Sequence, residues 1–104
     1  MLLVNTPDLK DRNYEIIGLC EGSTVYSKHF GKDLMAGLKN IVGGELKSYT
    51  EMLNDGKNKA KDSLVKEAMS MGADAVINVN YSITNLAQGT SLVILVTGTA
   101  VKFL

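Results

Sequence analysis

The chain has 104 residues, with eleven Lys or Arg, eleven Asp or Glu and a formal net charge of zero. This length predicts a single domain over residues 1–104, which buries about two thirds of the surface of the extended chain. Its 45% apolar content is typical of globular rather than disordered proteins. Because the basic residues are spread along the chain, we expect no nucleic-acid partner.

Cysteine usage and apolar runs indicate the compartment. A single cysteine, Cys20, excludes an internal disulfide and favours a reducing environment. The first ten residues, MLLVNTPDLK, have no basic region and too short an apolar run for a signal peptide. The longest apolar run, Leu92 to Val96, is too short to span a bilayer. We therefore expect a cytoplasmic protein with no membrane partner.

Two strands are predicted near the N-terminus. Leu2 to Asn5 forms a short apolar run, and Tyr14 to Tyr26 a longer one interrupted by Gly18 and Gly22. Glycines inside a strand usually mark a β-bulge or a close approach of another backbone. We expect one or the other at these two positions.

A short amphipathic helix is predicted over residues 30–42, ending at Gly43-Gly44. Its apolar face follows the i, i+4, i+7, i+8 pattern of Leu34, Leu38, Ile41 and Val42. A brief connection, Glu45 to Lys47, then leads to a longer helix.

The longer helix is predicted to begin near Ser48, which stands in capping-box register with Glu51. It should run for about 24 residues, or roughly 36 Å, with a bend at Asn54 to Gly56, where helix propensity is poor. Gly72 is expected to end it with a positive φ. One face of this helix carries the apolar residues Tyr49, Leu53, Ala60, Leu64, Ala68 and Met71.

After Gly72 the apolar pattern changes to a period of two, which predicts a half-buried strand from Ala75 to Thr84. Only Val76 breaks the alternation. The residues expected to face the helix are Ala75, Ile77, Val79, Tyr81 and Ile83. A polar loop over residues 85–90, with a turn at Gln88-Gly89, follows.

The last predicted strand, Ser91 to Phe103, is apolar on both faces, which is typical of a strand in the middle of a sheet. Leu92, Ile94 and Val96 form one face, and Val93, Leu95, Val101 and Phe103 form the other. The predicted helices can cover only one side of this sheet. We therefore expect a second copy of the protein to cover the other side.

Together these elements predict an α+β fold, a small two-layer β-α-β-β unit with a mixed three-stranded sheet. A right-handed crossover makes the first two long strands parallel. The last strand then lies antiparallel between them.

Five short motifs resemble the YbjQ-like family, and the resemblance covers nearly the whole chain. They are Ala36 to Gly44 (AGLKNIVGG), Tyr49, Gly72 to Val76 (GADAV), Thr97 to Val101 (TGTAV) and Gly18 to Gly22 (GLCEG). The family is functionally uncharacterised and is sometimes labelled heavy-metal-binding. The resemblance implies a subunit similar to that of dodecin and a ring-shaped homopentamer.

This chain departs from the family pattern in three places. Glu45 follows the double glycine where the family often has arginine, and the long helix carries lysines in place of arginines. Anion recognition by arginine is weakened accordingly. Cys20 stands where valine is more common, so it does not resemble a family ligand.

The heavy-metal label requires ligands that the sequence supplies sparsely. Soft metals need two to four converging thiolates or imidazoles, and the chain has one cysteine, Cys20, and one histidine, His29. We interpret Cys20 as a small buried apolar residue and His29 as a surface residue. No metal site and no cofactor are therefore predicted.

Four features are candidate ligand contacts, each with a structural alternative. Asp74 could contact a ligand or accept backbone hydrogen bonds in its turn. Gly43 and Gly44 could form an anion-binding nest or simply end a helix. Tyr49 is a further candidate, and Asn78 could line a cleft or be solvated.

No catalytic residue is assigned, because the single His29 has no identifiable orienting partner. We interpret the chain as a non-enzymatic homo-oligomeric module that binds a small ligand, a metal or a partner, or serves a structural role. The alternative is an enzyme whose site is assembled between subunits from Asp74, Tyr49 and a lysine. Flavin storage, by analogy with dodecins, rests on fold similarity alone.

Overall fold

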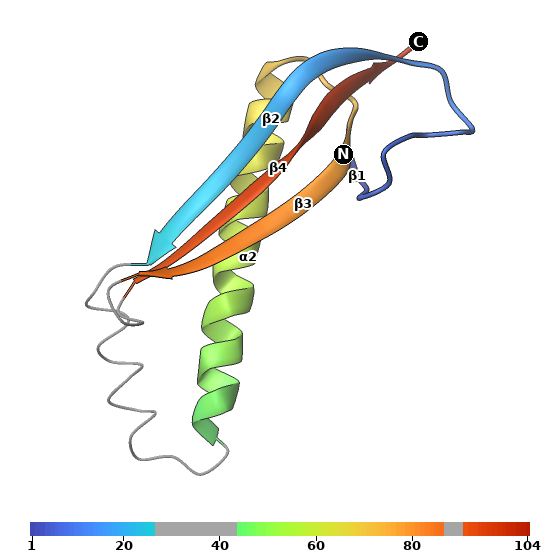
Figure 1. Ribbon diagram of the computed structural model, residues 1–104. Coiled ribbons are helices and arrows are strands. Elements are labelled where there is room, and N and C mark those ends of the chain that lie inside the picture. Colours follow the sequence, from blue (N-terminus) through green and yellow to red (C-terminus); the bar gives the residue numbers. More distant parts are fainter. Residues whose placement is uncertain (27–43, 87–90) are drawn as a thin grey trace.

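The structure is a computed structural model that describes residues 1–26, 44–86 and 91–104. The helix expected over 30–42, Gly43, His29 and the turn at Gln88-Gly89 lie outside the described residues. The described elements are one helix and four strands (Figure 1): β1 (Leu2–Leu3), β2 (Tyr14–Tyr26), α2 (Gly44–Ser70), β3 (Ala75–Leu86) and β4 (Ser91–Phe103).

The four strands form one mixed sheet in the order β1-β3-β4-β2, and α2 packs across one of its faces (Figure 1). β4 pairs antiparallel with both β2 and β3, and β1 pairs parallel with β3. The predicted α+β class and the central place of the last strand are confirmed. The short strand β1 extends the three expected strands to four.

The helix α2 begins at Gly44, four residues before the predicted capping box. The prediction of a start at Ser48 is wrong because the preceding Glu45, Leu46 and Lys47 are good helix formers that extend the helix backwards. The helix also continues through Asn54 to Gly56 without interruption. Gly56 is buried, and we attribute the absence of a break to this packing, which outweighs the local propensity.

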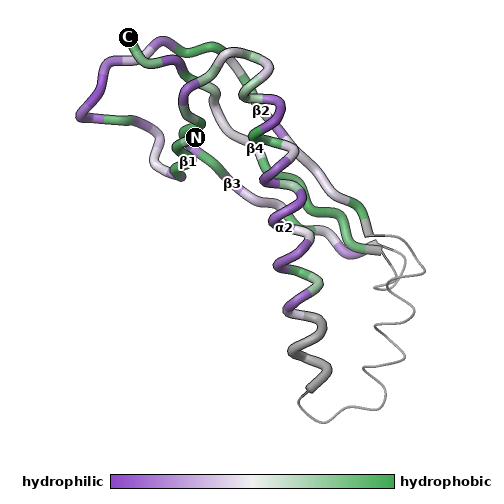
Figure 2. The backbone as a smooth tube through the Cα atoms, turned by 180° about the vertical axis from the view of Figure 1, so that it is seen from behind, coloured by the Kyte–Doolittle hydropathy of each residue, from purple (hydrophilic) through white to green (hydrophobic). Residues whose placement is uncertain are grey.

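The core lies between α2 and the inner face of the sheet, the face that the helix covers. Along α2 (Figure 2) hydrophilic and hydrophobic residues alternate, and every fourth residue is buried. The buried helix residues are Met52, Gly56, Ala60, Leu64 and Ala68. They pack on β2 and β4 residues such as Cys20, Ile94 and Val96. Leu53 and Met71, which the sequence placed on the same face, are only partly buried.

Gly22 brings α2 close to β2. A Cβ atom at this position would lie 2.3 Å from the Ala60 carbonyl oxygen and 2.4 Å from the Leu64 amide nitrogen. Gly18 lies at a register shift between Ile16 and Gly18, a β-bulge. The close approach and the bulge predicted for these glycines are confirmed, one at each. As a result, the helix contacts β2 most, β4 less and β3 least.

The alternation of side chains along β3 between the two faces of the sheet shifts at a second bulge, which lies between Ile77 and Asn80. Asn78 has a φ of 54° there. Before the bulge Val76 packs in the core beneath α2, whereas Ala75 and Ile77 pack on the opposite face with Val101. The prediction of a single apolar face from Ala75 to Ile83 is therefore wrong. Val76, the one residue that broke the pattern, is the residue that faces the helix at the start of this strand.

The turn after α2 has the geometry of a Schellman motif. Gly72 has a φ of 81°, as predicted. Its amide donates to the Met69 carbonyl, and the Ala73 amide donates to the Ala68 carbonyl, both at 3.0 Å. These bonds satisfy carbonyls at the helix end and direct the chain into β3.

The N-terminal segment, residues 4–13, covers one end of the outer face, the face of the sheet away from α2. Val4 and Leu9, together with Tyr14 and Phe103, pack against the cluster of Ala75, Ile77 and Val101. The expectation that only a second copy could cover this face is therefore wrong for this end. The rest of the outer face is open: Leu19 is 70% and Leu95 36% exposed.

Candidate functional site

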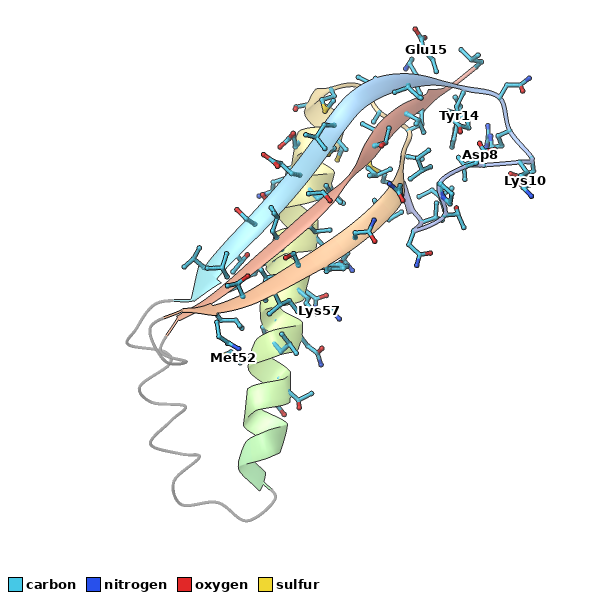
Figure 3. The ribbon with its side chains drawn as sticks, in the orientation of Figure 1. Asp8, Lys10, Tyr14, Glu15, Met52 and Lys57 are labelled. Atoms are coloured by element: carbon cyan, nitrogen blue, oxygen red, sulfur yellow. The ribbon has the colours of Figure 1, made fainter. Side chains whose placement is uncertain are left out.

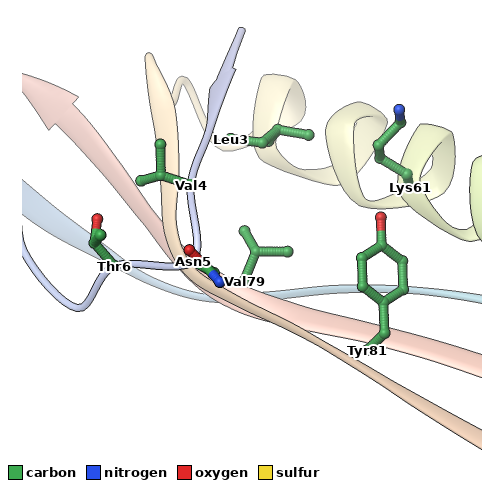
Figure 4. Close-up of a pocket in the computed structure, with 7 residues that line it drawn as sticks. All are labelled: Leu3, Val4, Asn5, Thr6, Lys61, Val79 and Tyr81. Carbon is green, nitrogen blue, oxygen red and sulfur yellow. The ribbon is translucent and has the colours of Figure 1, made fainter.

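A cavity of about 600 Å³ opens between α2, β1 and β3. We call it the wedge pocket. It is lined by Leu3, Val4, Asn5, Thr6, Lys61, Val79 and Tyr81 (Figure 4).

The position of the helix explains this cavity. Because α2 rests on β2, it stands away from the β1–β3 side of the sheet. The bulge at Asn78 then places Val79, and after it Tyr81, on the inner face without helix side chains packed fully over them. Tyr81 remains 39% exposed. The wedge pocket is thus the uncovered half of the inner face.

The floor of the wedge pocket is apolar and its rim is polar. Leu3 and Val79 lie between the two strands and the helix, and Tyr81 stands off β3 with its hydroxyl toward the helix turn that carries Lys61 (Figure 4). The side chains of Asn5 and Thr6 line the opposite end. None of the seven lining residues is acidic.

Two lysines lie near Tyr81. The Lys57 ammonium sits 5.5 Å from the centroid of the Tyr81 ring, within range of a cation–π interaction. Lys61 follows one helical turn later and lines the wedge pocket. Burial raises the pKa of the Tyr81 hydroxyl above its usual value, so at neutral pH this hydroxyl is a hydrogen-bond donor rather than a base.

The backbone of β1 is bonded to β3 on one side only. Val4 donates to the Val76 carbonyl and accepts from the Val79 amide, both at 3.0 Å, and Thr6 accepts from Asn78 at 2.8 Å. Because successive residues of a strand direct their backbone groups to opposite edges, those of Leu3 and Asn5 point to the free edge of the sheet.

The sequence candidates Asp74 and Tyr49 lie at opposite ends of α2. Asp74 follows the helix, its Oδ2 accepts from the Phe103 amide at 2.8 Å, and its own amide donates to the Val101 carbonyl at 2.8 Å. It therefore ties the turn to β4 rather than only to local backbone. Tyr49 is near the helix start, about 30 Å away at 1.5 Å per residue, so one chain does not bring the two together.

The other candidates are also apart from each other. Gly44 is the first residue of α2, and Gly43 lies outside the described residues. Asn78 occupies the bulge, where its φ of 54° uses the tolerance of asparagine for this conformation. Its carbonyl accepts from the Asn80 side chain at 3.0 Å.

Sequence reasoning did not assign a binding role to Lys61 or Tyr81. Two signals were present: Lys57 and Lys61 are spaced by four on the helix, and Tyr81 is the one residue with a polar tip on the apolar face of its strand. The bulge that brings Tyr81 opposite these lysines was not predicted.

Cys20 is fully buried beneath α2, and its thiol donates to the Leu64 carbonyl with a sulfur–oxygen distance of 3.3 Å. Burial, with a smaller effect of Glu67 and Glu21, raises the pKa of the Cys20 thiol. Within residues 1–26, 44–86 and 91–104, no three His, Cys, Asp or Glu side chains gather as a metal site would require. These residues do not fit a heavy-metal centre. The described part of the chain also contains no helix with the length and apolar character needed to cross a membrane.

One long helix across a four-stranded mixed sheet defines the class, a small two-layer α+β protein. A crystal structure from Pediococcus pentosaceus, described as a protein with unknown function of the DUF74 family, has the same fold. It superposes with a TM-score of 0.72 over 99% of this chain and 97% of that chain, at 17% sequence identity. At this identity the likeness concerns the fold alone.

Sequence comparison gives the family. Residues 1–104 match the YbjQ_1 family model, which is described as "Putative heavy-metal-binding". A UPF0145 protein from Clostridium novyi is 51% identical over 104 residues and covers 100% of both chains. Another from Helicobacter hepaticus is 55% identical over 93 residues, 89% of each chain. The chain belongs to the YbjQ family, which confirms the resemblance seen in its motifs.

Proposed function

We propose that this protein is a non-enzymatic binding module that assembles into a homo-oligomer through the outer face of its sheet. The observation that carries the proposal is the group of exposed apolar side chains on that face: Ile16, Leu19, Val25 and Leu95. These side chains lie among polar residues such as Glu21 and Ser23 rather than in one continuous patch, and a partner that covers them would bury exposed apolar surface. The other end of this face is already covered by residues 4–13.

A second copy of the chain fits this surface better than a charged partner does. Among outward-facing described residues of β2 between Leu19 and Val25, only Glu21 is charged, and the whole chain has zero net charge. Copies therefore do not repel one another. When two copies of a largely uncharged, partly apolar surface pack together, they bury apolar area without burying unpaired charges.

The sheet edges support a ring rather than a two-fold dimer. β2 is free along its outer edge in the described structure, and β3 is free beyond the stretch bonded to β1. Both strands are antiparallel to β4 and hence parallel to each other. Beside the outer-face contact, an edge of β2 on one copy can pair with β3 on the next in a head-to-tail contact, and such contacts form a ring when the rotation between copies closes. The family resemblance favours five copies.

A binding role agrees better with the wedge pocket than catalysis does. Its lining offers one ammonium, one protonated phenol and no carboxylate, so it lacks an acid–base pair. An enzyme using Asp74 and Tyr49 would need residues from neighbouring copies.

Light scattering on the purified protein tests self-association. We expect a mass of several subunits, and five if the ring follows the family resemblance. Leu19→Lys should reduce the mass, because it places a charge on the exposed outer face without disturbing the core. Met69→Lys is the matched control, since Met69 is 64% exposed on the helix. A folded wild-type monomer would contradict the proposal.

A further inference from the structure

We propose that the wedge pocket binds a small organic anion, a carboxylate or phosphate attached to an apolar body. The anionic group would lie beside Lys61 and the Tyr81 hydroxyl, and the body would lie on Leu3 and Val79. This inference gives a site and a ligand class to the binding role proposed above. It does not depend on self-association, because all lining residues belong to one chain.

Among the described residues, the charge that lines the wedge pocket is positive. Lys57 and Lys61 project from successive turns of α2, and within the described structure neither forms an ion pair. No acidic residue lines the cavity. An anion entering here gains an attraction that no carboxylate of these walls already satisfies.

Hydrogen-bonding groups stand at both ends of the floor. At one end the protonated Tyr81 hydroxyl can donate to an anionic oxygen. At the other end the Thr6 hydroxyl already donates to the Asp8 carbonyl at 3.1 Å, so its oxygen is left to accept. The Asn5 amide adds a donor and an acceptor there. A ligand with a polar group opposite its anionic end can therefore bond at both ends.

The apolar floor of the wedge pocket favours a ligand with an apolar body. Leu3 and Val79 are partly buried members of the core cluster and leave an apolar strip between the two polar ends. The volume of about 600 Å³ lies within the usual range of small-ligand sites. Because the cavity is open to solvent on one side, we expect millimolar rather than nanomolar affinity for a simple ligand.

Amide chemical-shift titration of the full chain is the test, with phenylbutyrate as the carboxylate probe. We expect shifts centred on Leu3, Asn5, Val79 and Tyr81. The uncharged analogue phenylbutanol should bind at least about fivefold more weakly, since it cannot use the lysine charge. Phenyl phosphate, run in parallel, shows whether the site prefers phosphate. Absence of shifts at these residues with both anions, or equal binding of phenylbutanol, overturns the proposal.

Matched variants locate the anionic end. Lys61→Gln should weaken phenylbutyrate about tenfold, the loss expected for one charged hydrogen bond, and Tyr81→Phe by a smaller factor. Lys66→Gln removes an exposed charge from the same helix and should leave binding unchanged. Equal losses in Lys61→Gln and Lys66→Gln would show a general charge effect and overturn the site. Light scattering on the same samples separates the two proposals, because binding by a monomer contradicts self-association alone.

Discussion

Small residues allow close contacts between the elements of this protein. At Gly22 the backbone of α2 occupies the space that a side chain on β2 would fill. At Gly98 an added Cβ would lie 2.4 Å from a methyl carbon of Val76. The two contacts differ in how they could relax. A valine methyl can rotate away, whereas the helix backbone over Gly22 moves only if the whole helix lifts.

Gly22→Ala is therefore expected to be among the most damaging single-methyl additions in the chain. The new Cβ would meet two backbone atoms of α2, and overpacking of this kind costs about 1–3 kcal/mol or more. Urea unfolding measures the loss. Ser23→Ala, on the exposed neighbour in the same strand, is the control and should change the unfolding free energy by less than about 0.5 kcal/mol. Equal stability of the two variants would contradict the close approach.

Gly72 differs from Gly22 because an added Cβ meets nothing within 4 Å. Only its φ of 81° restricts substitution. Gly72→Val should lower the unfolding free energy by about 1–2 kcal/mol, because a branched side chain tolerates positive φ poorly. Gly72→Asn should cost less, since asparagine tolerates this region. Thermal unfolding of both variants checks the order, and an unchanged melting temperature for Gly72→Val would contradict it.

The heavy-metal label of the family leads to a prediction about Cys20. Its thiol is buried, bonded to the Leu64 carbonyl and kept protonated by its surroundings. We expect no tight stoichiometric zinc or copper in untagged protein by elemental analysis. The double variant Cys20→Ser, His29→Ala is the control. One metal ion per subunit that disappears in the double variant would refute this prediction.

At the scale of elements, the N-terminal segment acts as a cover. Backbone hydrogen bonds at Val4 and Thr6 and one side-chain hydrogen bond between Tyr14 and Asp8 hold it in place. The Tyr14 hydroxyl donates to the Asp8 carboxylate, which also accepts from the Leu9 amide (Figure 3). The same bond lowers the pKa of Asp8 and raises the pKa of Tyr14. Asp8 therefore helps hold the cover above its ordinary pKa of 3.8, and this help is lost as the pH falls through the lowered value.

Asp8→Asn tests this fastening. The pKa of Tyr14 should fall back toward 10.0, because the hydrogen bond to the charged Asp8 is the main cause of its rise. Titration of the Tyr14 ring signals by NMR measures it. Asp11→Asn removes a nearby charge without removing the bond and should leave the pKa of Tyr14 where it was. A Tyr14 pKa that is the same in wild type and Asp8→Asn would rule out the fastening.

How far the sequence predicts this fold depends on the kind of signal. Strand bounds at β2 and β4 follow from apolar runs with glycine and polar limits, and local propensity and spacing suffice there. The face change in β3 was not predictable by the same means. One inserted residue reverses the facing of everything after it, and without the pairing partner β4 only Val76 departs from the alternation between Ala75 and Ile83.

The candidate site was less predictable than the fold, for a related reason. Asp74 and Gly44 were singled out by local motifs, and both lie at the ends of α2, where Asp74 accepts from the Phe103 amide of β4. The wedge pocket instead depends on where the helix crosses the sheet. That crossing is fixed by Gly22 and by the bulge at Asn78 together, two features about 56 residues apart that sequence periodicity cannot relate.

At the scale of the whole molecule, the two uncovered surfaces have different causes. The wedge pocket is open because α2, the one helix of the described residues, lies over β2 and cannot also cover β3. The outer face is open because residues 4–13, which cover it within the described part of the chain, extend over one end. The first surface carries positive charge, whereas the second carries exposed apolar side chains set among uncharged polar ones, with Glu21 as a charged exception. The contrast is the reason to assign a small anion to one and another copy of the chain to the other.

Leu95 is the position where self-association can be tested without loss of the fold. It lies on the central strand β4, faces outward opposite Ser23 and Ser82, and is 36% exposed. In Leu95→Lys the long side chain can reach water from an isolated subunit. In an assembled outer face the same ammonium would be buried without a partner, which is costly. We therefore expect a folded protein of reduced mass, with circular dichroism and light scattering as the paired measurements.

The conservative variant Leu95→Met supplies the comparison, since it keeps an apolar side chain of similar volume and should retain the wild-type mass. We thus expect both Leu95 variants to fold but to differ in oligomer mass, with Leu95→Lys the lighter. If Leu95→Lys keeps the wild-type oligomer, the outer face at β4 is not the interface. Assembly would then have to use the free edges of β2 and β3 without burying Leu95.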